Sequence, residues 1–179
     1  MNENDLLLAR KCLDGDRDAQ QKLFNLYSGL LMGICRRYIN NNAEAGDAFQ
    51  EGFIKIFNNL HNYKGNATLK TWSHSIMTNN AIDFLRKQRT KNVFIQITTE
   101  FEETYSDKYN NEEHEEISFT SDEAIGLLDQ LPDQYRTCLN LFAVDGYTHA
   151  EISALLGISE SSSRSNVARA RQLLKKKMK

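Results

Sequence analysis

Apolar residues recur at intervals of three and four along most of the chain, which is the spacing of one face of an α-helix. In the first half this spacing predicts four helices, over residues 6–15, 19–38, 45–60 and 69–89. Three asparagines at 40–42 separate the second helix from the third, and a polar loop over 61–67, with Gly65 as its turn residue, precedes the fourth. The first half is therefore expected to be entirely helical.

The helical spacing fails from Lys91 and returns at Thr120. Residues 91–119 are interpreted as a linker, because a stretch of this length without regular periodicity is usually functional or disordered. Within it, Val93 to Thr99 is compatible with a short strand or an extended segment.

Four more helices are predicted after the linker, over residues 120–130, 132–146, 148–156 and 160–179. Capping boxes at Thr120 and Thr148 mark two of their beginnings. The predicted fold class is thus all-α, with two helical domains at 1–90 and 120–179 joined by a flexible acidic linker at 91–119.

The net charge of −2 conceals three regions of different charge. Residues 1–99 hold 13 basic and 9 acidic groups, a net +4, and residues 124–179 hold 8 and 5, a net +3. Between them, residues 100–123 hold ten acidic groups and one lysine, a net −9. A block of like charge of this kind is typical of solvated or disordered interaction segments.

Composition excludes several classes of protein. The sequence contains no run of 18 apolar residues, so no membrane-spanning helix is expected. The acidic N-terminus lacks the apolar segment of a signal peptide. Cys12, Cys35 and Cys138 lie far apart and the four histidines show no ligand spacing, so neither disulfides nor zinc are expected. No nucleotide or nucleophile signature is present. We expect no enzyme activity, no cofactor or metal, no membrane insertion and a cytoplasmic location.

The strongest local pattern covers residues 148–171 and predicts a helix-turn-helix. A capped short helix and a turn at 157–159 precede a second helix that begins at Glu160 with several serines. Small side chains allow this helix to approach DNA closely, its first N–H groups can bind phosphate, and its arginines can donate to guanine edges. A solvated basic helix end is the alternative interpretation.

Two more polar faces are predicted, and either alone would be ordinary solvent-exposed surface. The face on the third predicted helix lies opposite its apolar stripe and comprises Asp47, Gln50 and Glu51. The face on the fourth helix comprises Asn79, Asp83 and Arg86, with Asn80 and Lys87 at its border.

Taken in order, these motifs resemble the sigma-70 family. Three motifs resemble region 2 of that family: Asp-x-x-Gln-Glu-x-Phe at 47–53, Gly-x-Ala-x-Leu-x-Thr-Trp at 65–72 and Asn-x-x-x-Asp-x-x-Arg at 79–86. Three further segments resemble region 4: Leu-Pro-x-x-x-Arg at 131–136, residues 146–159 and Arg-Ala-Arg at 169–171. Both regions within fewer than 200 residues resemble an extracytoplasmic-function, or group IV, sigma factor.

The resemblance implies a protein that binds core RNA polymerase, recognises the −10 and −35 promoter elements and promotes initiation of transcription. Contacts to the β′ clamp helices of the polymerase would come from Asp47, Gln50 and Glu51. Contacts to the opened −10 element would come from Lys64, Asn66, Asn79, Asn80, Asp83, Arg86 and Lys87. Contacts to the −35 duplex would come from Ser161, Ser162, Arg164, Ser165, Arg169 and Arg171. The implied partners are core polymerase (β′ clamp helices and β flap), promoter DNA and an anti-sigma factor.

Four positions depart from the family pattern, and one of them is Ser73, where the family often has leucine after the tryptophan. Ser163 stands where the family usually has a branched apolar residue, which predicts either looser packing behind the second helix of the helix-turn-helix or a shift of that helix. Gly46 and Gly52 lie inside the third predicted helix, where each glycine costs ~1 kcal/mol relative to alanine.

Two alternatives remain at this point. The chain could be a duplex-binding regulator with a sensor or dimerisation domain, or a sigma-like helical protein that does not initiate transcription. A sensor would not need the Gln50–Glu51 face or the loop at 65–72. The acidic linker likewise has two interpretations, a solubilising tether or a mimic of the RNA that occupies the polymerase exit path.

Overall fold

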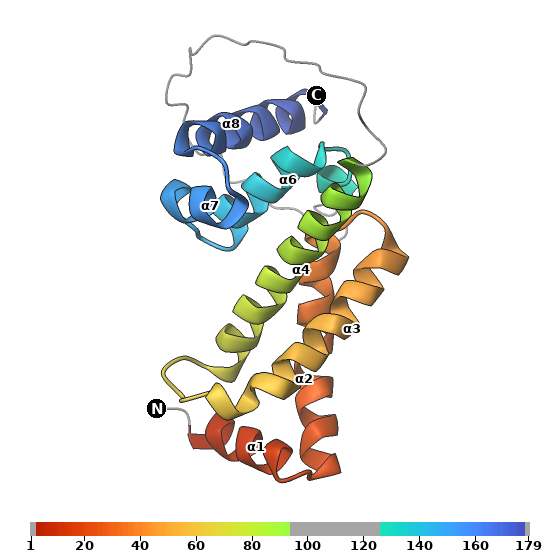
Figure 1. Ribbon diagram of the computed structural model, residues 1–179, viewed down its shortest axis with the longest axis vertical. Coiled ribbons are helices and arrows are strands. Elements are labelled where there is room, and N and C mark those ends of the chain that lie inside the picture. The colour runs from red at the N-terminus through yellow and green to blue at the C-terminus, as the bar shows by residue number, and fades with distance from the viewer. Residues whose placement is uncertain (1–2, 94–125, 178–179) are drawn as a thin grey trace. The chain divides into compact units, whose positions relative to one another are not determined.

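The computed structural model describes residues 3–93 and 126–177. The chain forms two compact units, Met1–Arg86 and Lys87–Lys179. All regular elements in the described ranges are helices, as the sequence predicts. Figure 1 shows the helices of each unit.

The first unit is built from α1 (Glu3–Leu13), α2 (Arg17–Tyr38), α3 (Asn42–Asn59), the 3₁₀ turn η1 (Leu60–Asn62) and most of α4 (Leu69–Val93), which continues beyond Arg86. Side-chain caps fix where the helices begin. The Asp16 carboxylate accepts from the first N–H groups of α2, and the Asn41 side chain does the same for α3. The Thr68 hydroxyl accepts from the N–H of Thr71 at the start of α4.

Aromatic rings join α2 to α3 within this unit. The Phe24 ring lies 4.9 Å from that of Phe53 and 6.2 Å from that of Phe49, between ring centroids. Phe49 and Phe53 are buried, which agrees with the apolar stripe that the sequence predicts for α3.

Helix α1 holds the loop that precedes α4. The Asp5 carboxylate accepts from the N–H of Leu69 at 2.8 Å, and the Leu6 side chain packs over Gly65. Gly65 has φ +73°, so the turn there requires a residue that tolerates the left-handed region. Helix α1 therefore holds the loop that carries Lys64 and Asn66 at its middle and at its C-terminal end.

The two glycines of α3 have different surroundings. A Cβ at Gly52 would lie 2.5 Å from the Sδ atom of Met77 in α4, whereas a Cβ at Gly46 would meet nothing within 4 Å. Met77 is fully buried, and the Cys35 thiol contacts its sulfur at 3.4 Å. Gly52 thus allows α3 and α4 to approach closely, while Gly46 has no packing role in this structure.

We therefore expect the two glycine-to-alanine substitutions to have opposite effects. Gly46→Ala should raise the free energy of unfolding by ~1 kcal/mol, because alanine favours the helix. Gly52→Ala should lower it by up to ~2 kcal/mol, because overpacking of a core costs about 1–3 kcal/mol and the helical gain of ~1 kcal/mol offsets only part of that. Fluorescence of Trp72, the single tryptophan of the chain, reports unfolding of this unit in urea. Equal effects of the two substitutions would contradict this packing role for Gly52.

The second unit contains α6 (Asp133–Leu139), the π-helical turn η2 (Asn140–Val144), α7 (His149–Leu156) and α8 (Glu160–Lys177). Arg136 in α6 is fully buried, where its Nε donates to the Leu128 carbonyl at 2.9 Å and its Nη2 pairs with Asp129. These bonds attach α6 to the segment before it.

Most helix ends in the described ranges lie within three residues of the predicted ones, and two differences change the picture more. Helix α4 continues through Val93, so residues 91–93, which were expected to belong to the linker, are helical. The helix predicted over 132–146 widens into η2 after Leu139, and the N–H of Asp145 donates to the carbonyl of Asn140. The predicted capping box at Thr120 and the remainder of the linker lie outside the described residues.

Candidate nucleic-acid and polymerase interfaces

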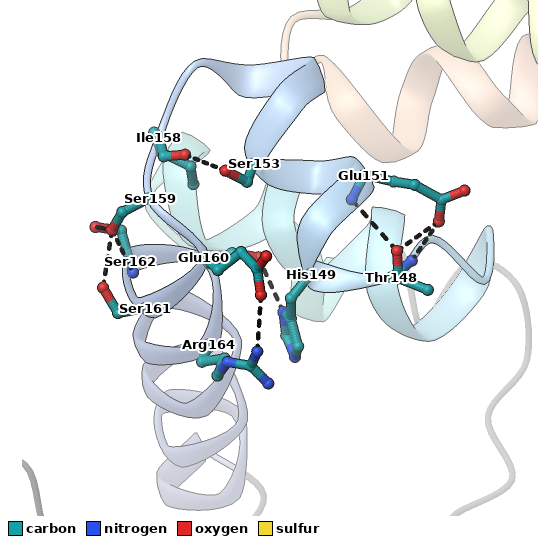
Figure 2. Close-up of polar contacts among 11 residues, drawn as sticks. Thr148, His149, Glu151, Ser153, Ile158, Ser159, Glu160, Ser161, Ser162 and Arg164 are labelled. Carbon is teal, nitrogen blue, oxygen red and sulfur yellow. Dashed lines mark hydrogen bonds and ion pairs between the residues drawn. The ribbon is translucent and has the colours of Figure 1, made fainter.

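Residues 148–177 form the helix-turn-helix that the sequence predicts (Figure 2). Thr148 and Glu151 make both bonds of a capping box at the start of α7. Gly157, at φ +68°, ends α7 in the left-handed conformation. The Ser159 hydroxyl accepts from the N–H of Ser162 at 3.0 Å and so caps α8. Local sequence signals thus fix the angle at which α8 is presented.

The buried face of α8 contains Ser163, Asn166, Val167 and Ala170. Ser163 is fully buried, and its hydroxyl lies 3.0 Å from Nδ1 of His149 in α7. The His149 ring in turn stacks on Phe142 at 4.4 Å between centroids. A polar contact therefore replaces the apolar packing expected at Ser163, and the structure shows no looseness at this position.

The six residues predicted to contact −35 DNA are not equally exposed. Ser161, Arg164 and Arg171 are exposed, whereas Ser162, Ser165 and Arg169 are half-buried. The Arg169 guanidinium donates to the Tyr135 hydroxyl at 3.4 Å, and that of Arg171 lies 5.6 Å from the Phe142 ring centroid. Arg164, one turn into α8, is exposed, and its guanidinium pairs with Glu160 at 2.9 Å.

Burial lowers the pKa of His149, and the positive charges of Arg164 and Arg171 lower it further. The negative charge of Glu160 has the opposite effect and raises this pKa. A histidine whose pKa is lower in the folded than in the unfolded protein stabilises the fold only while it is neutral. That stability is present above the unfolded pKa of ~6.5 and is lost as pH falls through the lower folded value.

We therefore expect the second unit to be less stable at about pH 5 than at about pH 7.5. His149→Gln, which stays neutral, should reduce this difference. Hydrogen exchange of α7 and α8 at the two pH values measures the effect, after correction for the intrinsic pH dependence of exchange. An identical pH dependence in both proteins would exclude His149 as its cause.

The predicted polymerase-contact residues lie on α3. Asp47 and Gln50 are exposed, and Glu51 is half-buried with its carboxylate 3.3 Å from the Lys55 ammonium. Ile54 follows on the same side of the helix and is 61% exposed. The notable signal that sequence reasoning missed is this isoleucine, which breaks the polar pattern of an otherwise solvated face.

Five of the seven predicted −10 residues are exposed, and the other two are half-buried or buried. Lys64 and Asn66 lie in the loop before α4, whereas the others are spread over residues 79–87 of α4. Lys64, Asn66, Asn79, Arg86 and Lys87 are exposed, and the half-buried Asp83 pairs with Arg86 at 3.2 Å.

Asn80 does not fit the predicted role of a DNA contact. Its side chain is buried at 2% exposure, donates to the Ala48 carbonyl at 2.7 Å and accepts from the Lys55 ammonium at 2.6 Å. Both ends of the amide are therefore used to join α4 to α3, and we correct the assignment of Asn80 to a structural one.

Two family models match the chain. Sigma-70 region 2 matches residues 23–91, and Sigma-70 region 4 matches residues 121–174. The first match covers α2 to α4, and the second covers the helix-turn-helix. The chain belongs to the sigma-70 family of RNA polymerase sigma factors. It is a transcription initiation factor that recognises promoters through regions 2 and 4, and it is not an enzyme.

Curated relatives agree with this assignment along the full length of the sigma factor. The sigma factor SigW of Bacillus subtilis, an ECF protein, is 29% identical, with 92% of this chain and 91% of the relative aligned. The sigma-H factor of Pseudomonas aeruginosa is 27% identical, with 97% and 93% aligned.

Two solved structures share the fold at low sequence identity. CnrH, solved with the cytosolic domain of CnrY, has a TM-score of 0.51 at 19% identity. The alignment covers 97% of this chain and 96% of CnrH. The sigma factor RpoE of Bartonella quintana, solved with the anti-sigma factor NepR, has a TM-score of 0.52 at 18% identity, with 87% and 94% covered.

None of the described helices of this sigma factor combines the length and apolarity needed to cross a membrane. Over residues 3–93 and 126–177, no three histidine, cysteine or acidic side chains are grouped so as to hold a metal ion. The three cysteines are buried as free thiols, and burial raises the pKa of Cys35 to about 12.

Proposed function

We propose that region 4 of this sigma factor contacts the −35 duplex through the outward face of α8, with Arg164 as its principal base contact. The exposed guanidinium of Arg164, one turn into the second helix of a helix-turn-helix, is the observation that supports this best. The second helix of such a motif enters the major groove with its N-terminal residues at the base edges. Ser161, Ser162 and Ser165 would allow a close approach, and Arg169 and Arg171 would contact phosphate.

Region 2 would hold the opened −10 strand. We assign this role to the loop residues Lys64 and Asn66 and to Asn79, Asp83, Arg86 and Lys87 of α4. Unstacking a base costs a few kcal/mol, so the surface that receives it must be formed in advance. The bonds from Asp5 to the start of α4 and from Asn80 to α3 give this surface a rigid support.

The polymerase-contact face of α3, Asp47, Gln50 and Glu51, would bind the β′ clamp helices of core polymerase. We add Ile54 to this face, because an isoleucine that is 61% exposed gains from burial against a partner. Region 4 would bind the β flap, and an anti-sigma factor would compete for these surfaces in the cytoplasm. Anti-sigma control is supported by the similarity to RpoE, whose structure was solved with NepR.

Promoter selection with reconstituted holoenzyme tests this proposal. The protein is combined with core polymerase and a promoter library randomised at the −35 and −10 segments, and transcripts are sequenced. We expect Arg164→Ala to lose preference at one −35 position, at a cost of ~1–3 kcal/mol. Matched Lys176→Ala, a change near the end of α8, should weaken all promoters alike. An unchanged −35 preference in Arg164→Ala would contradict the base contact.

A further inference from the structure

Glu160 is the single acidic residue of α8, and it stands at the first position of a helix that is otherwise basic. Its Oε2 atom lies 2.9 Å from Nη2 of Arg164, one turn along the helix. Figure 2 shows the two side chains extending from the same side of α8, with His149 of α7 beside them. The base contact proposed above is therefore paired with a carboxylate before DNA arrives.

Stability of the helix gives a weak reason for this carboxylate. The side chains of Arg164 and Glu160 are 62% and 49% exposed, and an exposed pair of this spacing contributes little. Near DNA the same carboxylate is unfavourable, because the phosphates repel it and the adjacent N–H groups would otherwise bind phosphate. An acid at this position therefore weakens sequence-independent binding to DNA.

We propose that Glu160 is a specificity-determining residue for the −35 element. Its carboxylate accepts a hydrogen bond from the exocyclic amine of cytosine or adenine in the base pair next to the one contacted by Arg164, and it disfavours guanine and thymine there. This inference rests on the proposed contact between α8 and the −35 duplex.

The chemistry of the major groove separates the four bases in this way. Cytosine and adenine present an amine donor there, whereas guanine presents the acceptors O6 and N7 and thymine presents the acceptor O4. An ionised carboxylate is an acceptor only. It therefore gains a hydrogen bond from cytosine or adenine and is repelled by the acceptor atoms of guanine or thymine. Such a repulsive element increases discrimination between sites without increasing affinity for the correct one.

The ion pair also holds both groups in place. Oε2 of Glu160 is used by Arg164, while Oε1 can accept from a base. Arg164 uses one Nη2 proton for the pair and retains further donors for the O6 and N7 atoms of guanine. Two adjacent base pairs would thus be recognised by one connected donor and acceptor unit.

Holoenzyme binding to duplex promoters with every base at each −35 position tests the proposal. In Glu160→Gln we expect discrimination at one position to fall about 5- to 100-fold. Affinity for scrambled −35 sequences should rise in the same protein, because a negative charge is removed. Glu160→Asp keeps the charge at the helix start but is one methylene shorter, so it should lose discrimination without this rise. Asp14→Asn, which removes one charge from an exposed turn after α1 in the first unit, is the matched control and should change neither quantity.

The outcomes distinguish the two levels of the proposal. An unchanged preference in Glu160→Gln, together with a lost preference in Arg164→Ala, would overturn the role of Glu160 alone. If wild-type holoenzyme shows no −35 preference, contact by α8 is wrong and the role of Glu160 is wrong with it. A uniform loss of affinity for all sequences, with a lower unfolding temperature, would make Glu160 structural and overturn the proposal.

Discussion

Asp129→Ala is expected to destabilise region 4 by about 3 kcal/mol, which is a large share of the stability of a small domain. The Arg136 side chain is fully buried, and Asp129 is the acid that pairs with its Nη2. Burial lowers the pKa of Arg136, while Asp129 and Asp133 oppose this effect. Without Asp129 the charge remains in the interior with less compensation. The 43% exposure of the Asp129 side chain admits water, which places the cost at the lower end of the usual range.

Arg136→Met should cost less than Asp129→Ala, although it removes the larger side chain. Methionine keeps much of the volume, no buried charge is left behind, and the half-exposed Asp129 can return to water. The lost bond to the Leu128 carbonyl is the remaining penalty.

Hydrogen exchange of α8 in the full chain measures this asymmetry. Trp72 fluorescence is unsuitable here, because Trp72 lies in α4 of the first unit. Protection of α8 should fall more in Asp129→Ala than in Arg136→Met, while α2 and α3 remain unchanged in both. The reverse order would show that shape, and not the buried charge, dominates at this position.

The features that the sequence predicts well are those that depend on neighbouring residues. The capping box at Thr148, the left-handed Gly157 and the Ser159 cap each need only a few consecutive residues. Helix periodicity likewise predicts the α2 and α3 stripes, because the spacing of apolar residues determines which face is buried.

The features that the sequence does not predict arise between elements distant along the chain. Asn80 belongs to a polar pattern on α4, but its burial depends on Gly52 and Lys55 of α3. The partner of Ser163 is a histidine fourteen residues earlier, which periodicity cannot reveal. The change from α6 to the π-helical turn η2 is also not predicted by a glycine or proline, because neither element contains one.

Charge reversal on the polymerase-contact face of α3 should reduce the affinity for core polymerase at least ~100-fold. Like charges placed opposite one another in an interface cost several kcal/mol. Asp47 is exposed, so Asp47→Lys alters this face without breaking a core contact. Glu51→Lys also removes the ion pair with Lys55, whose ammonium holds Asn80, so part of its effect would be structural.

Asp47→Lys is therefore the sharper test, and the double variant with Glu51→Lys should bind core polymerase more weakly still. Asp14→Lys reverses an equally exposed acid in the turn between α1 and α2, away from α3, and serves as the matched control. Binding of each protein to core polymerase is measured by competition with wild type. Trp72 fluorescence in urea confirms that the first unit remains folded. Wild-type affinity in folded Asp47→Lys would remove this residue from the interface, whereas a loss equal to that of Asp14→Lys would indicate only a general effect of net charge.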